Sequence, residues 1–196
     1  MNQLLNPWIT PAPDARPEGD AAEVHFPPPA AIREPLLGMV EPDAADRLGQ
    51  RLVTGTATLW VTGVHGGAGE SRLSNILAGA RPTEHAWPVP EDGYGKPAVL
   101  LACRSDMRGL KAAQSALIQW ASGAAPDVEL LGLAVLADAP GKLPKALGEF
   151  TVLVGGGAPR LWMLPWVESW RLGATDTGAP GREYQRLSAD LAALTN

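Results

Sequence analysis

Apolar runs and amphipathic segments alternate along the chain from residue 58 onward. Four runs have the apolar character of buried strands: 59–62, 98–103, 130–137 and 160–166. Segments with apolar residues at helical spacing follow these runs: 71–79, 107–121, 143–154 and 183–194. Pro165 closes the last strand, and Gly155 to Gly157 end the helix before it. Strand and helix therefore alternate about four times.

This alternation predicts an α/β fold. Strand–helix–strand units form right-handed crossovers, so we expect a three-layer α-β-α domain with a mostly parallel sheet of about four or five strands. Ligands of such sheets bind beyond the carboxyl ends of the strands. We therefore expect four loops to meet at one edge: 63–70, 103–107, 138–142 and 165–171.

The N-terminal region differs in composition from the rest of the chain. Its first 35 residues hold eight prolines and few apolar residues, which predicts a flexible arm over 1–42 and a domain over 43–196. Trp8 and Phe26 are its candidate anchors. The sequence of 43–52 predicts a short capped helix, and 80–97, rich in Pro and Gly, reads as a connection.

Charge and cysteine content narrow the functional classes. A net charge of −5 provides no general basic field, so no direct nucleic-acid partner is expected. The chain has no apolar stretch of membrane-spanning length and no signal-peptide pattern, and we expect a cytoplasmic protein. The single cysteine, Cys103, excludes an intrachain disulfide, and its apolar run predicts a buried thiol. No His/Cys cluster has the spacing of a metal site.

Residues 59–73, LWVTGVHGGAGESRL, carry the strongest chemical signal. A strand runs through a glycine-rich turn into a helix, which is the outline of a loop whose backbone N–H groups bind phosphate. The pattern G-x-x-x-x-G-K-[ST] requires Lys at position 70 and Gly at 64, whereas this chain has Glu70 and Val64. The candidate phosphate- or nucleotide-binding residues are Gly63, His65, Gly66, Gly67, Ala68, Gly69, Glu70, Ser71 and Arg72.

Glu70 opposes the usual ligand of such a loop. A carboxylate about 4 Å from a phosphate repels each charge by roughly 4 kcal/mol at an effective dielectric constant of 20. Two other roles are open to Glu70. It stabilises the first turn of a helix by about 0.3–1 kcal/mol, or it fills the anion site as a built-in substitute for phosphate. Ser71 is a Mg²⁺ ligand only if nucleotide binds, and otherwise a candidate helix cap.

HGGAGES (65–71) resembles the deviant phosphate-loop signature K-G-G-x-G-K-[ST] of the MinD/ParA-type P-loop ATPases. His65 stands at that family's signature lysine and Glu70 at its Walker lysine. Residues 157–173 are similar to the segment that lines the nucleotide base, and Ala137-Asp138 fall near its base-recognising asparagine. The resemblance spans 58–173 and implies a P-loop NTPase-like domain with Asp138, Pro165 and Trp166 on the base side.

The chain departs from this family in two respects, the signature lysines and the strands that follow the first helix. Both lysines are absent, as are the strands that carry the water-activating aspartate and the D-x-x-G switch. The chain also resembles an uncharacterised actinobacterial family with the HGGAGES loop, some members of which are linked to conjugation-type secretion gene clusters. The resemblance thus implies a degenerate domain without catalytic residues, and ATP or ADP with Mg²⁺ are its only candidate cofactors.

Three functional hypotheses follow. The first is a non-hydrolysing domain with a regulatory or scaffolding role beside an unknown protein partner, with weak nucleotide or anion binding at 63–71; a homodimer is compatible with it. The second is an active nucleotide-dependent ATPase or switch in which His65, Arg72 or a residue from a partner chain replaces the lysine. The third is a pure protein-binding adaptor that uses Trp166, Trp170 and the arm.

Three further features are less specific. Asp138 fits either a ligand-facing loop or an ordinary Asp-Ala-Pro-Gly turn. Arg104 and Asp106, at the end of the strand 98–103, predict a salt-bridged loop. Trp162 is expected in the core, and for Trp166 and Trp170 core packing is favoured over stacking on a ligand or partner.

Overall fold

A parallel sheet forms the centre of the computed structural model, which describes residues 34–36, 38–91, 93, 95–173 and 180–195. The sheet has five strands in the order β3-β2-β5-β6-β7. Their bounds are Ala80–Pro82 (β3), Leu59–Gly63 (β2), Ala98–Arg104 (β5), Glu129–Leu136 (β6) and Leu161–Leu164 (β7). Every neighbouring pair is parallel. The predicted parallel sheet of four or five strands is confirmed.

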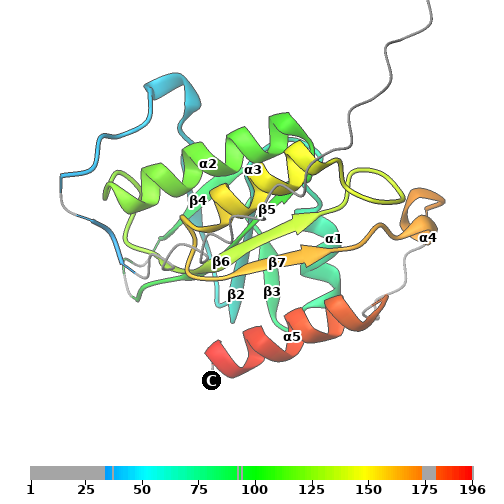
Figure 1. The fold of residues 1–196 in the computed structure, drawn as a ribbon. Helices are drawn as coiled ribbons and strands as arrows, with labels where there is room; N and C mark the ends of the chain where they lie inside the picture. The colour runs from blue at the N-terminus through cyan, green and yellow to red at the C-terminus, as the bar shows by residue number, and fades with distance from the viewer. Residues whose placement is uncertain (1–33, 37, 92, 94, 174–179, 196) are drawn as a thin grey trace, which may run out of the picture.

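Helices cover both faces of this sheet (Figure 1). On one face lie α2 (Met107–Ala121) and α3 (Lys145–Gly155), and on the other lie α1 (Glu70–Ile76) and α5 (Arg182–Thr195). Alternate residues of β5 supply the two cores: Leu101 packs with the α2 and α3 side chains, and Leu100 packs with those of α1 and α5. The three-layer architecture is therefore as predicted.

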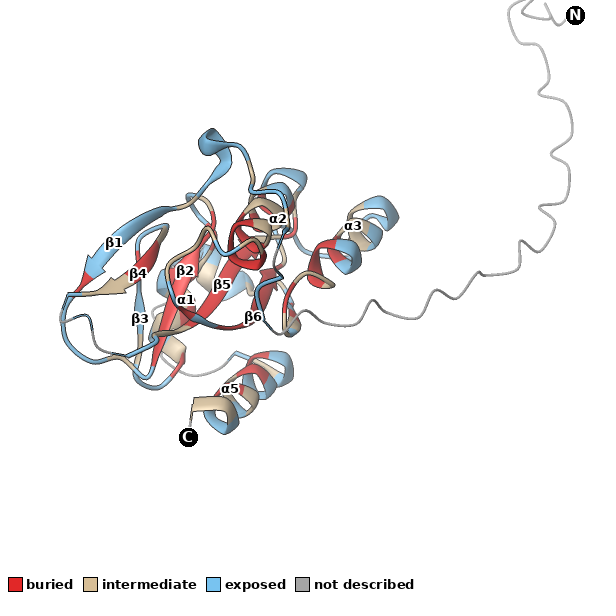
Figure 2. Ribbon diagram, turned by 90° about the vertical axis from the view of Figure 1, so that its left-hand side faces the viewer, coloured by how far each residue is buried: buried red, intermediate tan, exposed pale blue. Residues whose placement is uncertain are grey.

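Two predictions about the chain before residue 98 were wrong. The segment 43–52 holds only a 3₁₀ turn (Ala44–Asp46) and then a strand, β1 (Gly49–Val53). The connection 80–97 contains β3 and a further strand, β4 (Ala86–Pro90), which pairs in parallel with β1 as a separate two-stranded sheet. Figure 2 shows the largely exposed β1 on the outer side of β4. Pairing between distant segments overrides the local helix propensity here.

Gln119 attaches this small sheet to α2. Its side chain is 3% exposed. Its Oε1 accepts the Leu48 N–H at 2.9 Å and the Trp87 Nε1–H at 3.1 Å, and its Nε2 donates to the Leu48 carbonyl at 3.1 Å. One amide therefore binds three polar groups from two separate segments, the Trp87 N–H buried and the two Leu48 groups half-buried.

The start of the described chain also packs on the domain. The Leu36 N–H donates to the Ala121 carbonyl, and Met39 packs against the core beneath α2. Residues 1–33 of the predicted arm, including Trp8 and Phe26, lie outside the described residues. None of the helices in the described ranges has the length and apolar composition that crossing a bilayer requires.

Cys103 lies in β5 at the centre of the sheet and is fully buried, as predicted. Burial, followed by the charge of Asp106, raises the pKa of its thiol from 9.0 to about 12. The thiol is thus held in its neutral, unreactive form.

We predict that Gln119→Leu lowers the free energy of unfolding by roughly 2–4 kcal/mol, because it leaves the Leu48 and Trp87 groups buried without partners. Urea denaturation measures this loss. Gln114→Leu on the same helix is the control, since Gln114 is half-buried and its side chain forms no hydrogen bond with the described residues. Equal losses in the two variants would contradict the bridging role.

We also predict that stability falls as pH rises from about 9 to about 12. In this window the unfolded Cys103 thiol loses its proton and the folded one keeps it, so the unfolded state is favoured by up to about 1.4 kcal/mol per pH unit. Cys103→Ala should flatten this slope when unfolding is measured at successive pH values. Tyr184, whose pKa burial raises to about 12, maintains a residual slope above pH 10 in both proteins.

Candidate functional site

The loops at the carboxyl ends of the strands surround a pocket of about 400 Å³. Each of the four predicted loops, or the residue beside it, contributes to its wall. The lining residues are His65, Gly66, Gly67, Arg72, Arg104, Asp106, Arg108, Ala137, Asp138, Pro165, Trp166, Val167, Trp170, Arg171 and Tyr184. This is the edge at which parallel sheets bind ligands.

Two glycines allow the loop between β2 and α1 to close tightly. Gly69, the residue before α1, has φ +99°, and a Cβ there would lie 2.6 Å from Leu136 Cδ2. A Cβ on Gly63 would lie 2.9 Å from Glu70 Oε2. Larger residues would therefore strain the turn at 69 and displace the carboxylate at 63.

Glu70 points away from the pocket. Its side chain is 8% exposed and does not line the pocket. Oε2 accepts the Gly63 N–H at 2.7 Å, and Oε1 lies 3.4 Å from His85 Nδ1. The Glu70 carboxylate thus accepts the N–H at the end of β2, on the side of the loop that faces away from the pocket. The repulsion expected between Glu70 and a phosphate therefore does not follow from this geometry.

His85 reaches Glu70 through an unusual backbone. Glu84 and His85 have φ +55° and +63°, a conformation that is uncommon outside glycine. The Nδ1 of His85 also lies 3.2 Å from the Gly63 carbonyl. Since both neighbours of Nδ1 are acceptors, this nitrogen carries the proton. Through His85, the connection between β3 and β4 therefore contacts both ends of the loop that joins β2 to α1 and stabilises it.

His65 is engaged within the loop. Its Nε2 accepts the Arg104 N–H at 3.1 Å, so the proton of the ring sits on Nδ1, 2.9 Å from the Gly66 carbonyl. Gly109 permits this contact, because a Cβ there would lie 2.9 Å from His65 Nε2. In this arrangement both nitrogens of His65 have protein partners.

Arg104 ties the loop to β6. Its Nε donates to the Gly67 carbonyl and its Nη1 to the Ala137 carbonyl, both at 3.0 Å. Asp106 instead accepts the Gly109 N–H at 2.6 Å and caps α2. The predicted salt-bridged loop was therefore wrong. Two backbone carbonyls bind the Arg104 side chain, and the Gly109 N–H binds the Asp106 side chain.

Several donors on the wall of the pocket have no acceptor. Within the described ranges, Arg108 forms no ion pair or hydrogen bond, and the N–H groups of Gly66 and Gly67 donate to no protein atom. Arg171 lies over the Trp166 ring, 5.8 Å from its centroid. The pocket thus offers exposed cationic and N–H donors to a ligand.

Aromatic residues form another part of the pocket wall. Trp170 meets Tyr184 edge to face at a centroid distance of 5.1 Å, and the Tyr184 hydroxyl donates to the Pro165 carbonyl at 2.9 Å. Trp166 is half-buried and donates from Nε1 to Glu168 Oε2 at 2.6 Å. The helix that carries Trp170, α4 (Glu168–Arg171), was not predicted.

Sequence and structure agree on part of this site. Seven of the predicted residues line the pocket: His65, Gly66, Gly67, Arg72, Asp138, Pro165 and Trp166. Gly63, Ala68, Gly69, Glu70 and Ser71 support the loop from outside the lining. Ser71 is exposed and is the second residue of α1, so its reading as the helix cap was wrong; Gly69 precedes the helix.

Reasoning from sequence did not include Arg104, Arg108, Arg171 and Trp170 among the ligand-binding residues. Arg104 and Arg108 flank the start of α2, and Arg171 and Trp170 follow β7. Their common signal is position: each lies within a few residues of a predicted strand's carboxyl end.

The fold is a three-layer α/β domain with a pocket at the carboxyl edge of its sheet. A family model described as a family of unknown function (DUF6668) matches residues 57–185, and the chain belongs to this family. The matched range runs from just before β2 into α5 and contains every lining residue of the pocket. No curated protein and no solved structure matches the chain.

We predict that Glu70→Ala lowers the free energy of unfolding by about 1–3 kcal/mol, since it leaves the Gly63 N–H buried without an acceptor. Glu70→Gln should cost less, because its amide oxygen still accepts that N–H. Chemical denaturation of the two variants, with Glu149→Ala on the exposed face of α3 as control, measures the difference. A loss as large in Glu70→Gln as in Glu70→Ala would contradict this role.

Proposed function

We propose that this domain binds a phosphorylated ligand of the nucleotide type without hydrolysing it. The observation that carries the proposal is the convergence of Arg104, Arg108 and Arg171 with the Gly66–Gly67 turn on one pocket. Guanidinium groups and free backbone N–H groups are the donors that proteins use for phosphate oxygens.

The pocket's charge supports an anionic ligand. Arg72, Arg104, Arg108 and Arg171 line it, against the carboxylates of Asp106 and Asp138. Asp106 is already engaged as the α2 cap. Cations therefore outnumber the carboxylates facing the pocket, and the Glu70 charge is held behind the loop by the Gly63 N–H.

The aromatic wall supports a ligand with a planar ring. Trp166 and Trp170 line the pocket beside Arg171, and a base can stack on an indole face. A volume of about 400 Å³ lies within the range of small-molecule sites. These features favour a nucleotide over inorganic phosphate.

The arrangement of the loop favours binding without hydrolysis. The position of the Walker lysine holds Glu70, which turns away from the pocket, and the hydroxyl-bearing Ser71 lies outside the lining. His65 is occupied by Arg104 and Gly66, so it does not replace the lysine. We therefore assign the domain a regulatory or scaffolding role in a larger assembly, with ligand occupancy as its signal.

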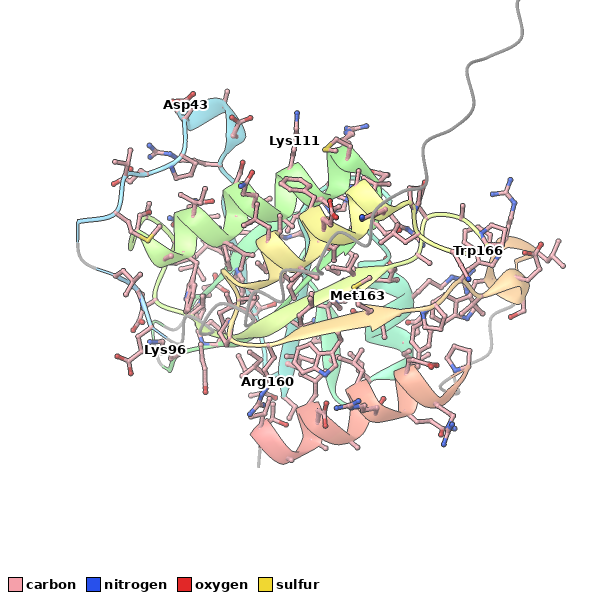
Figure 3. The ribbon with its side chains drawn as sticks, viewed as in Figure 1. Asp43, Lys96, Lys111, Arg160, Met163 and Trp166 are labelled. Carbon is pink, nitrogen blue, oxygen red and sulfur yellow. The ribbon has the colours of Figure 1, made fainter. Side chains whose placement is uncertain are left out.

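We predict that Arg108→Ala weakens the binding of Mg-ADP and Mg-ATP by about tenfold or more, which corresponds to one lost charged hydrogen bond. Isothermal titration calorimetry measures the affinities. Lys111→Ala is the matched control, because Lys111 is also exposed on α2 but lies outside the pocket (Figure 3). Affinity should also fall with added salt.

Two further measurements complete this test. Glu70→Gln should bind nearly as well as the wild type, because that side chain does not face the ligand, and a phosphate-release assay should show no turnover. Failure of ADP, ATP, GTP and pyrophosphate to bind at millimolar concentration would refute the proposal. An equal loss of nucleotide affinity in Arg108→Ala and Lys111→Ala would refute the proposed location of the site. Release of phosphate from ATP would refute the proposal that the domain does not hydrolyse its ligand.

A further inference from the structure

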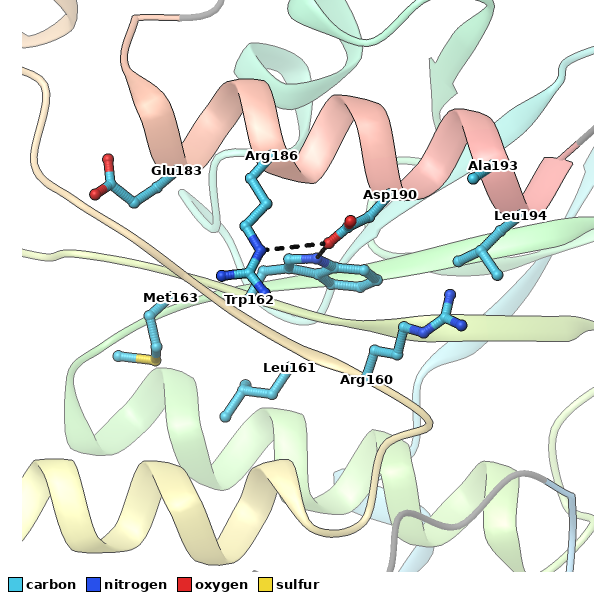
Figure 4. A pocket seen from close by; sticks show the side chains of 9 residues that line it. All are labelled: Arg160, Leu161, Trp162, Met163, Glu183, Arg186, Asp190, Ala193 and Leu194. Atoms are coloured by element: carbon cyan, nitrogen blue, oxygen red, sulfur yellow. Dashed lines mark hydrogen bonds and ion pairs between the residues drawn. The ribbon is translucent and has the colours of Figure 1, made fainter.

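The strand β7 is an open edge of the main sheet. Among the described strands it pairs only with β6, on one side. A cavity of about 720 Å³ lies between this edge and α5 (Figure 4). Met163 is 46% exposed on the strand. An unprotected apolar strand of this kind is a template for pairing with another chain.

The hydrogen-bond pattern shows which backbone groups are open. The carbonyl of Arg160 accepts the Leu133 N–H of β6, and the carbonyl of Leu164 accepts the N–H of Ala137, the residue that follows β6. In a parallel ladder alternate residues face the same neighbour, so Trp162 also faces β6. Leu161 and Met163 therefore direct their N–H and C=O groups outward, away from the sheet.

We propose that β7 is the interface of a symmetric homodimer, in which two copies pair their β7 strands antiparallel about a twofold axis at Trp162. This register places Leu161 of one copy opposite Met163 of the other, as a pair that exchanges both hydrogen bonds. The same pair occurs twice by symmetry. Four hydrogen bonds then satisfy all the outward groups of Leu161 and Met163 in both copies.

The prolines that flank the strand fit the same register. Pro159 and Pro165 are equally distant from Trp162 along the chain, in the sequence Pro-Arg-Leu-Trp-Met-Leu-Pro. Antiparallel pairing centred on Trp162 sets Pro159 of one copy opposite Pro165 of the other. Neither residue has an N–H group, so the ladder ends at the same point on both sides.

Side-chain charge is complementary in this arrangement. Figure 4 shows Glu183 at the Met163 end of the cavity and Arg160 at the Leu194 end. Since the two β7 strands run in opposite directions, Arg160 of each copy faces Glu183 of the other. Both side chains are exposed and form no ion pair within the described chain.

The remaining charges of the cavity balance within one copy. Arg186 lies 3.9 Å from Asp190, which also accepts the Trp162 Nε1–H at 2.9 Å. On the opposite face of the strand, Leu161 and Met163 form an apolar cross-strand pair that covers the exposed Met163 side chain. No uncompensated charge is buried by the contact.

The interface is separate from the nucleotide-type pocket, because neither Arg160 nor Met163 lines that pocket. The proposal therefore stands or falls independently of the proposed function. We expect the full chain to have twice its monomer mass of 20.5 kDa in sedimentation velocity at micromolar concentration. A monomer under these conditions overturns the proposal.

A charge exchange tests the twofold register. Arg160→Glu and Glu183→Arg should each weaken dimerisation, and the double variant should restore it, because each change then meets its complement in the other copy. Recovery in the double variant is specific to this register. A dimer that both single variants leave intact, or a double variant that stays monomeric, contradicts it.

A second pair of variants tests the strand itself. Met163→Lys should raise the dissociation constant at least about tenfold, because it removes both cross-strand apolar pairs. Leu52→Lys is the matched control, since Leu52 is 66% exposed on β1, a strand of the separate two-stranded sheet. The amides of Leu161 and Met163 should also exchange more slowly in concentrated than in dilute wild-type protein. Exchange rates of these amides that do not depend on protein concentration overturn the pairing. A structure of the dimer in which a segment other than β7 pairs with β7 overturns it as well.

Discussion

The hydrogen bond between the Glu70 carboxylate and the Gly63 N–H sets the character of the site. It joins the end of β2 to the start of α1 across the glycine-rich turn, and it fixes the direction of the one acidic side chain in the loop. With the carboxylate turned away, the glycine-rich turn contributes the backbone of Gly66 and Gly67 and the ring of His65 to the pocket, and no acidic group. The residue that argues against phosphate in the sequence therefore does not place its charge in the pocket.

The sequence predicted the elements whose stability depends on their own residues. β5 and β6 are continuous apolar runs, and α2 combines helical spacing with an Asp106 cap, so their positions were clear. β1 and β4 were missed because their support comes from each other and from Gln119, which lies 71 residues after Leu48. A strand with four exposed residues has no apolar pattern to detect.

The sequence predicted the position of the pocket in the fold, but only some of the side chains that line it. Parallel topology determines the edge where the loops meet, and His65, Asp138 and Trp166, which lie in those loops, line the pocket there. The orientation of Glu70 depends on His85, whose backbone adopts a rare conformation that no local pattern indicates. Exposed arginines such as Arg108 follow no periodicity, and only the folded arrangement shows that they share a pocket with Arg171.

The two edges of the sheet are unlike. β3 is three residues long, ends in Pro82 and carries the exposed Arg81, whereas β7 is uncharged and apolar throughout. Proline and charge discourage strand addition at an edge. A sheet with one receptive edge and one blocked edge joins a single neighbour and then stops. Growth into a fibre would need both edges, so the difference between β3 and β7 makes any assembly through this sheet self-limiting.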